Sequence, residues 1–197
     1  MPDPTDFITV VSGVPRSGTS LMMQLLAAGG LPPLTDEIRE ADPSNPRGYF
    51  EFEPVKRLRS DQTWLGDAPG RAVKIIHLLL RELPTDGRFQ YRVLLMKRPL
   101  EEVVWSQKAM LERQGKTGAE PAKLIPVYQN QLHEIEDWLT TQRCFRWMPV
   151  EYQRVLIDPV ETAKKVQAFL NRPLDLEAMA AAVSPGLCHH RIPDQAV

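Results

Sequence analysis

The chain has 197 residues, of which 43% are hydrophobic and 25% charged, values typical of a globular protein that buries a core. The formal net charge of −1 argues against a protein that coats nucleic acid or a membrane surface, and no apolar run reaches the roughly 20 residues of a membrane span. An acidic N-terminus and only two cysteines, Cys144 and Cys188, predict a cytoplasmic protein with reduced thiols and no disulfide framework.

The first predicted unit is a strand, a loop and a helix near the N-terminus. Residues 7–12 form an apolar, β-branched run of strand length, and a helical pattern follows from Thr19. Between them, Gly13 and Gly18 have the spacing of a phosphate-binding P-loop, where backbone N–H groups and the helix dipole favour an anion. Thr19 stands where P-loop kinases carry lysine, so Arg16 is the cation of this loop. The unit therefore predicts an anion-binding site that lacks the lysine with which P-loop kinases bind ATP.

The next part of the chain contains a long loop, a helix and a second strand. Residues 29–50 are rich in proline and lack apolar periodicity, which indicates a loop over the phosphate site with a helical turn around residues 36–40. A helix is predicted over residues 53–64. Residues 72–76 are typical of a buried strand, and His77 follows it.

A third strand and a helix form the next predicted unit. Residues 92–96 are apolar and end at Lys97 and Arg98, after which Pro99 suits the first position of a helix. Ser106 shares a helical face with apolar side chains, so we expect it on the buried side.

The C-terminal part is predicted to add a long helix over residues 122–142, a strand over residues 145–150 and two further helices. Asp158 precedes a proline and, three residues on, a glutamate, which is the order that caps a helix. That helix is expected to run to about residue 170, and the last helix spans about residues 175–183.

Alternating strands and long crossovers predict an α/β fold with a parallel sheet flanked by helices. We expect one domain over residues 1–197, with its core at about residues 7–183. Ligands bind beyond the C-terminal ends of such strands. Three predicted strands end at Gly13, at residues 74–77 and at residues 97–98, so polar and cationic groups should collect at this edge.

Several side chains at this edge have chemistry suited to an anionic ligand. Arg98 offers a donor fork and Ser106 a hydroxyl for a second phosphate, although a surface arginine and a helix-face serine are the simpler interpretations. Lys74 is a candidate electrostatic clamp and His77 a candidate general base, although a lone histidine beside an apolar run is usually structural. The rival bases are carboxylates in or beside the covering loop: Asp36, Glu37 and Glu51.

The P-loop resembles that of the sulfotransferase family, enzymes that use 3′-phosphoadenosine 5′-phosphosulfate (PAPS). The matching residues are Pro15, Arg16, Ser17, Gly18, Thr19 and Ser20. In the family this loop holds the 5′-phosphosulfate, and the version with arginine is similar to the bacterial and tyrosylprotein branches. Arg98, with Ser106 eight residues later, matches the segment that binds the 3′-phosphate. The resemblance implies a P-loop nucleoside triphosphate hydrolase-like sulfotransferase fold.

Two further segments extend the resemblance to about residues 7–175. Residues 150–159 resemble a late strand and helix start of the family, which implies a donor-binding role for Tyr152. Residues 45–51 resemble a segment frequent in small bacterial members.

The chain departs from the family pattern at the base and at the C-terminus. Cytosolic members carry Lys-Thr-His with the histidine as base, whereas Lys74 and His77 are three residues apart. In the tyrosylprotein branch the base is a glutamate about twenty residues past the P-loop arginine, where Asp36 and Glu37 fall. The C-terminal Arg-Lys-Gly segment that binds the 3′-phosphate in cytosolic members is missing, and Arg191 is the residue that could bind this phosphate in its place.

The sequence therefore predicts sulfuryl transfer from PAPS to a hydroxyl or amine of a small-molecule or glycan acceptor, without a metal and with adenosine 3′,5′-bisphosphate as product. Arg16 and Lys74 would neutralise the charge on the bridging oxygen, and Asp36, Glu37, Glu51 or His77 would take the acceptor's proton. The alternatives are a P-loop kinase that uses ATP and a nucleotide-binding module without turnover. Neither the acceptor nor the oligomeric state follows from the sequence.

Overall fold

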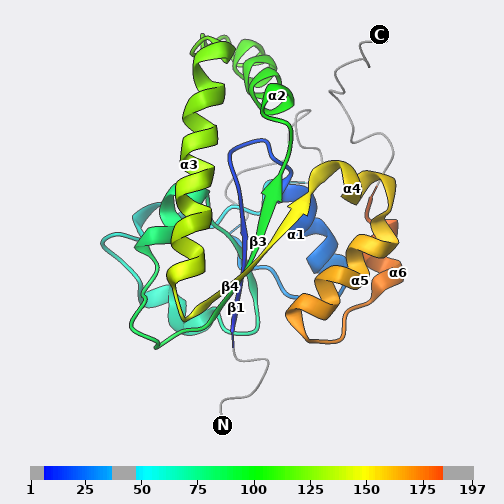
Figure 1. The fold of residues 1–197 in the computed structure, drawn as a ribbon. Helices are drawn as coiled ribbons and strands as arrows, with labels where there is room; N and C mark the ends of the chain where they lie inside the picture. Colours follow the sequence, from blue (N-terminus) through cyan, green and yellow to red (C-terminus); the bar gives the residue numbers. More distant parts are fainter. Residues whose placement is uncertain (1–6, 37–47, 184–197) are drawn as a thin grey trace.

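The computed structural model describes residues 7–36 and 48–183, which surround a four-stranded parallel sheet (Figure 1). The strands are β1 (Ile8–Ser12), β2 (Ala72–Lys74), β3 (Tyr91–Lys97) and β4 (Phe145–Glu151). Their order in the sheet is β2-β1-β3-β4, and all three pairings are parallel. The predicted α/β fold with a central parallel sheet is thus confirmed.

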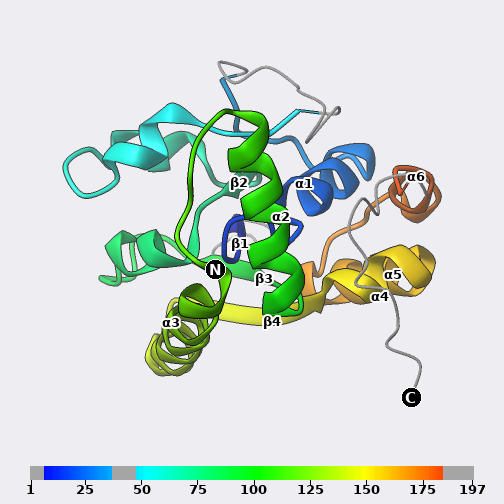
Figure 2. The same cartoon turned by 90° about the horizontal axis from the view of Figure 1, so that it is seen from above.

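Helices cover both faces of this sheet (Figure 2). On one face lie α1 (Thr19–Ala28), α5 (Pro159–Leu170) and α6 (Leu176–Ala181). On the other lie α3 (Pro121–Thr141) and the short 3-10 helices η1 (Glu53–Arg57), η2 (Thr63–Asp67) and η3 (His77–Glu82). Successive strand residues point to opposite faces, so Val10 packs in the second layer and its neighbour Val11 in the first. This alternation gives the sheet a buried apolar cluster on each face.

Helix α2 (Leu100–Arg113) extends beyond the C-terminal ends of the strands and packs against α3 (Figure 1). A small apolar cluster of Val14, Val103 and Leu132 joins the loop after β1 to these two helices. The loop after β1 is therefore supported from the side on which ligands bind in parallel α/β sheets.

The predicted helix over residues 53–64 is wrong, because this stretch forms η1 and η2 with a break between them. At the break the Asp61 carboxylate accepts hydrogen bonds from both the backbone N–H and the hydroxyl of Thr63, at 3.0 and 2.6 Å. Such a local side-chain contact competes with helical hydrogen bonding and turns the chain. The predicted turn around residues 36–40 lies largely outside the described residues.

The sequence also missed two elements, the helix α4 (Tyr152–Ile157) between β4 and α5 and the 3-10 helix η3 that follows β2. By contrast, the predicted start of α5 is confirmed: the Asp158 side chain accepts from the Glu161 N–H at 3.0 Å. Cys144 is a buried free thiol. Within residues 7–36 and 48–183, no helix combines the length and apolar character needed to cross a membrane.

Candidate functional site

The centre of the candidate site is the loop of residues 13–18, which joins β1 to α1. Two of its glycines have no room for a side chain: a Cβ at Gly13 would lie 2.4 Å from Ser17 Oγ, and one at Gly18 would lie 2.4 Å from the Tyr152 ring. Arg16 also adopts a left-handed φ of 73°. The first intrahelical hydrogen bond runs from Met22 N–H to Gly18 O. The N–H groups of the turn before it therefore face the loop, as in anion-binding helix starts.

The structure brings three predicted site residues together at this loop. Arg16 Nε donates to Ser106 Oγ at 3.1 Å, although the two residues are 90 apart in sequence. Arg98 Nη1 donates to the Arg16 carbonyl oxygen at 3.2 Å across 82 residues. Both partners come from the unit that follows β3, the strand beside β1. The P-loop arginine and the predicted Arg98–Ser106 pair thus form one continuous constellation.

Arg98 is a buried cation held on several sides. Its Nε donates to Glu102 Oε2 at 2.8 Å, and the side chains of both residues are only 7% exposed. The second oxygen of Glu102, Oε1, accepts from Gln153 Nε2 at 2.9 Å. The Arg98 guanidinium carbon also lies 4.4 Å from the centre of the Tyr152 ring, which is the geometry of a cation–π contact. Sequence reasoning missed the roles of Glu102 and Gln153, and the only available signal was the i, i+4 spacing of Arg98 and Glu102.

Lys97 does not take part in this arrangement. It is paired instead with Glu136 of α3, and burial lowers the pKa of its amino group. Lys97 and Arg98 are adjacent, yet the structure shows that only the second contacts the P-loop.

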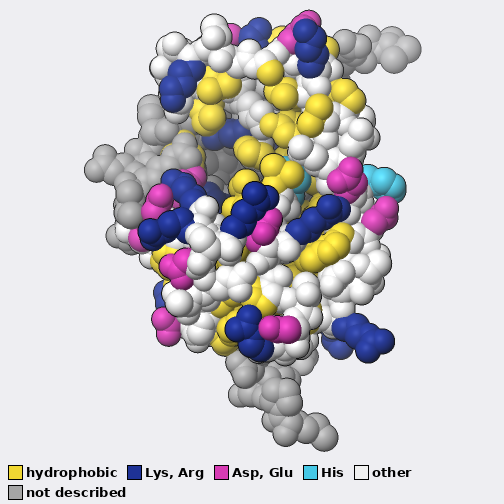
Figure 3. Space-filling view, turned by 90° about the vertical axis from the view of Figure 1, so that its left-hand side faces the viewer, with side chains coloured by type: hydrophobic (Ala, Val, Ile, Leu, Met, Phe, Trp, Pro, Cys, Tyr) yellow, Lys and Arg dark blue, Asp and Glu magenta, His cyan; other side chains and the backbone are white. Residues whose placement is uncertain are grey.

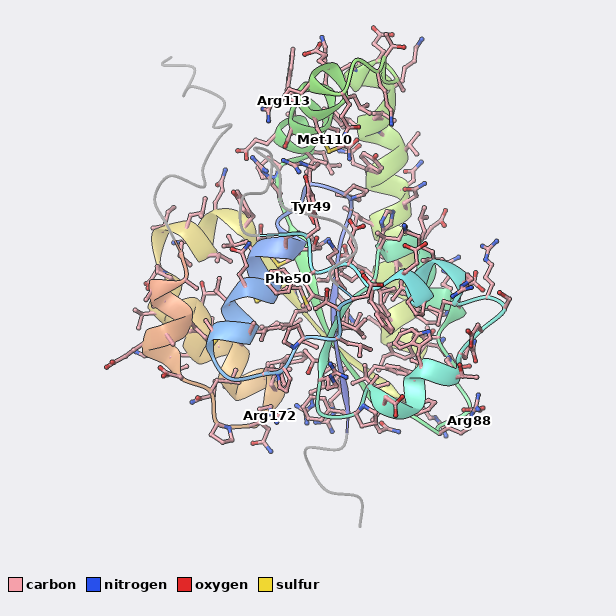
Figure 4. The ribbon with its side chains drawn as sticks, turned by 180° about the vertical axis from the view of Figure 1, so that it is seen from behind. Tyr49, Phe50, Arg88, Met110, Arg113 and Arg172 are labelled. Carbon is pink, nitrogen blue, oxygen red and sulfur yellow. The ribbon has the colours of Figure 1, made fainter. Side chains whose placement is uncertain are left out.

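Lys74 approaches the loop from β2. Its Nζ lies 3.5 Å from Ser20 Oγ and 3.7 Å from Glu51 Oε1, and it also donates to the Tyr49 carbonyl oxygen. Ser20 Oγ donates to the same carbonyl at 3.3 Å. The segment at residues 48–51 therefore lies against the start of α1. Figure 4 shows Tyr49 at the same end of the molecule as Met110 and Arg113, whereas Arg88 and Arg172 lie at the opposite end.

His77 lies beneath the P-loop. It is 1% exposed, with Nδ1 3.3 Å from Gly13 O and Nε2 2.9 Å from Gln131 Oε1. Both ring nitrogens therefore lie within hydrogen-bond distance of protein oxygens, an arrangement that fixes a histidine in a scaffold. A neighbouring contact braces the same loop, since Gln107 Nε2 donates to Pro15 O at 2.9 Å.

The other predicted residues divide between the scaffold and the part of the chain that is not described. The Asp36 carboxylate accepts from the Glu53 N–H. The Ser17 hydroxyl is buried against Gly13, and the Ser17 N–H donates to Val14 O at 3.1 Å, so both polar groups of Ser17 face the loop's interior. Glu37 and Arg191 lie outside the described residues. In the described part of the chain, no group of three or more His, Cys, Asp or Glu side chains is placed to hold a metal ion.

One face of the molecule is hollowed in its upper half (Figure 3). Hydrophobic side chains lie above the hollow and to its right, a Lys or Arg side chain lies within it, and further Lys and Arg side chains lie below it among Asp and Glu side chains. The positive charge is consistent with an anionic ligand.

The chain matches no protein-family model and no curated protein, whereas several solved structures share its fold. The sulfotransferase domain of the olefin synthase from Synechococcus PCC 7002 has a TM-score of 0.58 and 18% identity, covering 93% of this chain and 80% of that one. The sulfotransferase domain from the curacin biosynthetic pathway gives 0.51 and 18%, covering 94% and 86%. Sulfotransferase STF9 from Mycobacterium avium gives 0.51 and 13%, covering 95% and 69%. At these identities the likeness shows a sulfotransferase fold.

Proposed function

We propose that this protein is a sulfotransferase that moves a sulfuryl group from PAPS to a hydroxyl or amine of a small-molecule or glycan acceptor. The observation that carries the proposal is the contact of Arg16 with Ser106 and Arg98. This contact places the P-loop beside a second set of side chains that can bind an anion. PAPS needs two such sets, because its ribose carries a phosphosulfate at the 5′ position and a phosphate at the 3′ position. The sulfotransferase fold supports the same proposal.

The residues present fit the two charged ends of this donor. The N–H groups of Thr19 and Ser20, with the Lys74 ammonium 3.5 Å from Ser20 Oγ, suit a 5′-phosphosulfate. Arg98 and Ser106 suit a 3′-phosphate, because a guanidinium and a hydroxyl both donate to phosphate oxygens. When bound, PAPS supplies the activated sulfuryl group.

During transfer, the residues of this chain would neutralise charge and accept a proton. Arg16 and Lys74 would stabilise the negative charge that develops on the donor's bridging oxygen. Among the described candidates for the base, the geometry favours Glu51, since its carboxylate lies 3.7 Å from the Lys74 ammonium, which is itself 3.5 Å from Ser20 Oγ. By contrast, Asp36 Oδ2 accepts from the Glu53 N–H, and both ring nitrogens of His77 lie within hydrogen-bond distance of protein oxygens. Glu37 stays a candidate on sequence grounds.

Calorimetric titration with adenosine 3′,5′-bisphosphate in the absence of magnesium tests the donor site. We expect binding by the wild type and a loss of about 1.5–3 kcal/mol, roughly tenfold or more in Kd, in Arg98→Ala, because a charge-assisted phosphate contact is removed. Ser106→Ala should weaken binding less and leaves the buried ion pair intact. Arg88→Ala is the matched control, since this exposed arginine lies at the opposite end of the molecule (Figure 4).

Each other outcome favours a different class of protein. If the wild type binds ATP with magnesium and not the bisphosphate, the protein is a P-loop kinase and the proposal is wrong. Bisphosphate binding without transfer of labelled sulfuryl to any acceptor would indicate a nucleotide-binding module.

A further inference from the structure

The ion pair of Arg98 and Glu102 is unusual for its burial. Both side chains are 7% exposed, and Glu102 makes a second contact to Gln153 of α4. Removing a carboxylate and a guanidinium from water is costly, and a buried ion pair is often no more stabilising than well-packed apolar side chains. Stability alone therefore does not account for a carboxylate at this position.

The carboxylate also carries a cost for anion binding, because its charge opposes that of Arg98. A site that needed only positive charge near the P-loop would be better served by a neutral residue at position 102. The contribution of Glu102 must then lie in geometry.

Glu102 fixes the orientation of the Arg98 guanidinium group. Its Oε2 holds Arg98 Nε at 2.8 Å, while Arg98 Nη1 is held by the Arg16 carbonyl and the guanidinium faces the Tyr152 ring. Contacts at two nitrogens and one face define the plane of a guanidinium, whose long side chain otherwise samples many rotamers.

The same helix carries the second predicted phosphate ligand. Glu102 and Ser106 are four residues apart in α2, hence on one helical face, and Ser106 is 2% exposed. Gln153 ties this face to α4 through the second oxygen of Glu102, at 2.9 Å. The position of α2 and the direction of Arg98 are thus coupled through one carboxylate.

We propose that Glu102, supported by Gln153, is a positioning residue that directs Arg98 at the donor's 3′-phosphate and so makes the site selective for 3′-phosphorylated nucleotides. This inference rests on the proposed function. It predicts that loss of Glu102 erases the preference for a 3′-phosphate and leaves binding of the rest of the nucleotide intact.

The test compares two ligands by calorimetry, adenosine 3′,5′-bisphosphate and adenosine 5′-monophosphate. In Glu102→Ala we expect the Kd of the bisphosphate to rise at least tenfold and that of the monophosphate to change less than twofold. Glu102→Gln should rescue bisphosphate binding to within threefold of the wild type, because its amide can accept from Arg98 and, after rotation of the Gln153 amide, donate to Gln153. The matched control is Glu101→Gln, which removes an exposed charge one residue away.

The outcomes separate this inference from the function on which it rests. If the wild type does not prefer the bisphosphate, the proposed donor site and this inference both fail. If the wild type prefers it but Glu102→Ala binds it equally well or more tightly, only the positioning role is wrong. An equal loss for both ligands would also overturn it, since it would indicate general damage to the P-loop. Should Glu102→Ala not fold, Gln153→Ala must show the same ligand-selective loss, at roughly threefold, or the inference is rejected.

Discussion

Gly18 joins the loop of residues 13–18 to α1 at a point where the backbone touches an aromatic ring. Its φ is 102°, a conformation that favours glycine, and an added Cβ would lie 2.4 Å from Tyr152. The Tyr152 ring in turn lies 4.4 Å from the Arg98 guanidinium. The loop conformation and the placement of Arg98 therefore depend on the same small residue.

We expect Gly18→Ala to destabilise the protein by about 1–3 kcal/mol, because it adds backbone strain and displaces the Tyr152 ring. It should also weaken bisphosphate binding at least tenfold, since the ring faces Arg98. Denaturant unfolding and calorimetry measure the two effects. Gly66→Ala is the control, as its added Cβ meets no atom within 4 Å. A Gly18→Ala protein as stable as the control would contradict this account of the loop.

Tyr91 is a buried tyrosine whose hydroxyl has no hydrogen-bond partner in the described part of the chain. Burial raises the pKa of this hydroxyl well above that of a free tyrosine. Above about pH 10 the unfolded state loses its proton while the folded state keeps it. The unfolded state is then favoured, and the free energy of unfolding falls as the pH rises.

Tyr91→Phe should therefore raise the free energy of unfolding at pH 7 by about 1 kcal/mol, since it removes an unsatisfied buried group. It should also reduce the loss of stability between pH 9 and 11, measured by urea unfolding across that range. A smaller loss should remain, because burial also raises the pKa of the Cys144 thiol. A variant with the same alkaline slope as the wild type would show that Tyr91 is not the group responsible.

The sequence predicted the residues of the site better than their contacts. The P-loop and Arg98 could be placed at one edge because parallel strands end together, and Ser106 could be placed on the buried side of the following helix. The ion pair with Glu102 could not, since it depends on how α2 and α4 pack on the sheet. The scaffold contacts of His77 were equally out of reach, because Gln131 reaches it from α3, more than fifty residues away.

At the scale of elements, short polar contacts decide where helices begin. Asp158 caps α5 by accepting from the Glu161 N–H, and the cap lies between two consecutive helices, α4 and α5. The sequence predicted this start because the capping residues are adjacent. It did not predict α4, because a helix of six residues with two buried side chains, Tyr152 and Val155, is too short to show a repeating apolar pattern. The predicted helix at residues 53–64 failed for a related reason, since one aspartate, Asp61, was enough to interrupt it.

Removal of the α5 cap should therefore have a measurable cost. We expect Asp158→Ala to lower the free energy of unfolding by about 1 kcal/mol, because the Glu161 N–H loses its acceptor. Asp158→Asn keeps a side-chain oxygen and should stay close to the wild type. Urea unfolding of the three proteins measures both differences, and an equal loss in the two variants would assign the effect to charge instead of to the hydrogen bond.

At the scale of the whole molecule, the candidate donor site joins elements that are distant in sequence. The loop after β1 contacts Arg98 after β3 and Tyr152 after β4, and the first turn of α1 contacts Lys74 of β2, so each of the four strands contributes to the site. A ligand that bridges these groups would bind the folded state and not the unfolded chain. Its binding energy would then add to the stability of the entire sheet.

Adenosine 3′,5′-bisphosphate at a hundredfold excess over its Kd should add about 2.7 kcal/mol to the free energy of unfolding. For a chain of this size that corresponds to a rise in Tm of roughly 5–10 °C. The rise should persist in EDTA, because the proposed site holds the donor with N–H, hydroxyl and cationic groups and needs no metal. The Tm is measured with the bisphosphate in EDTA and with ATP in magnesium, which compares a metal-free sulfotransferase site with a kinase site. A rise only with ATP and magnesium would show that the sheet edge serves phosphoryl transfer and would overturn the sulfotransferase proposal.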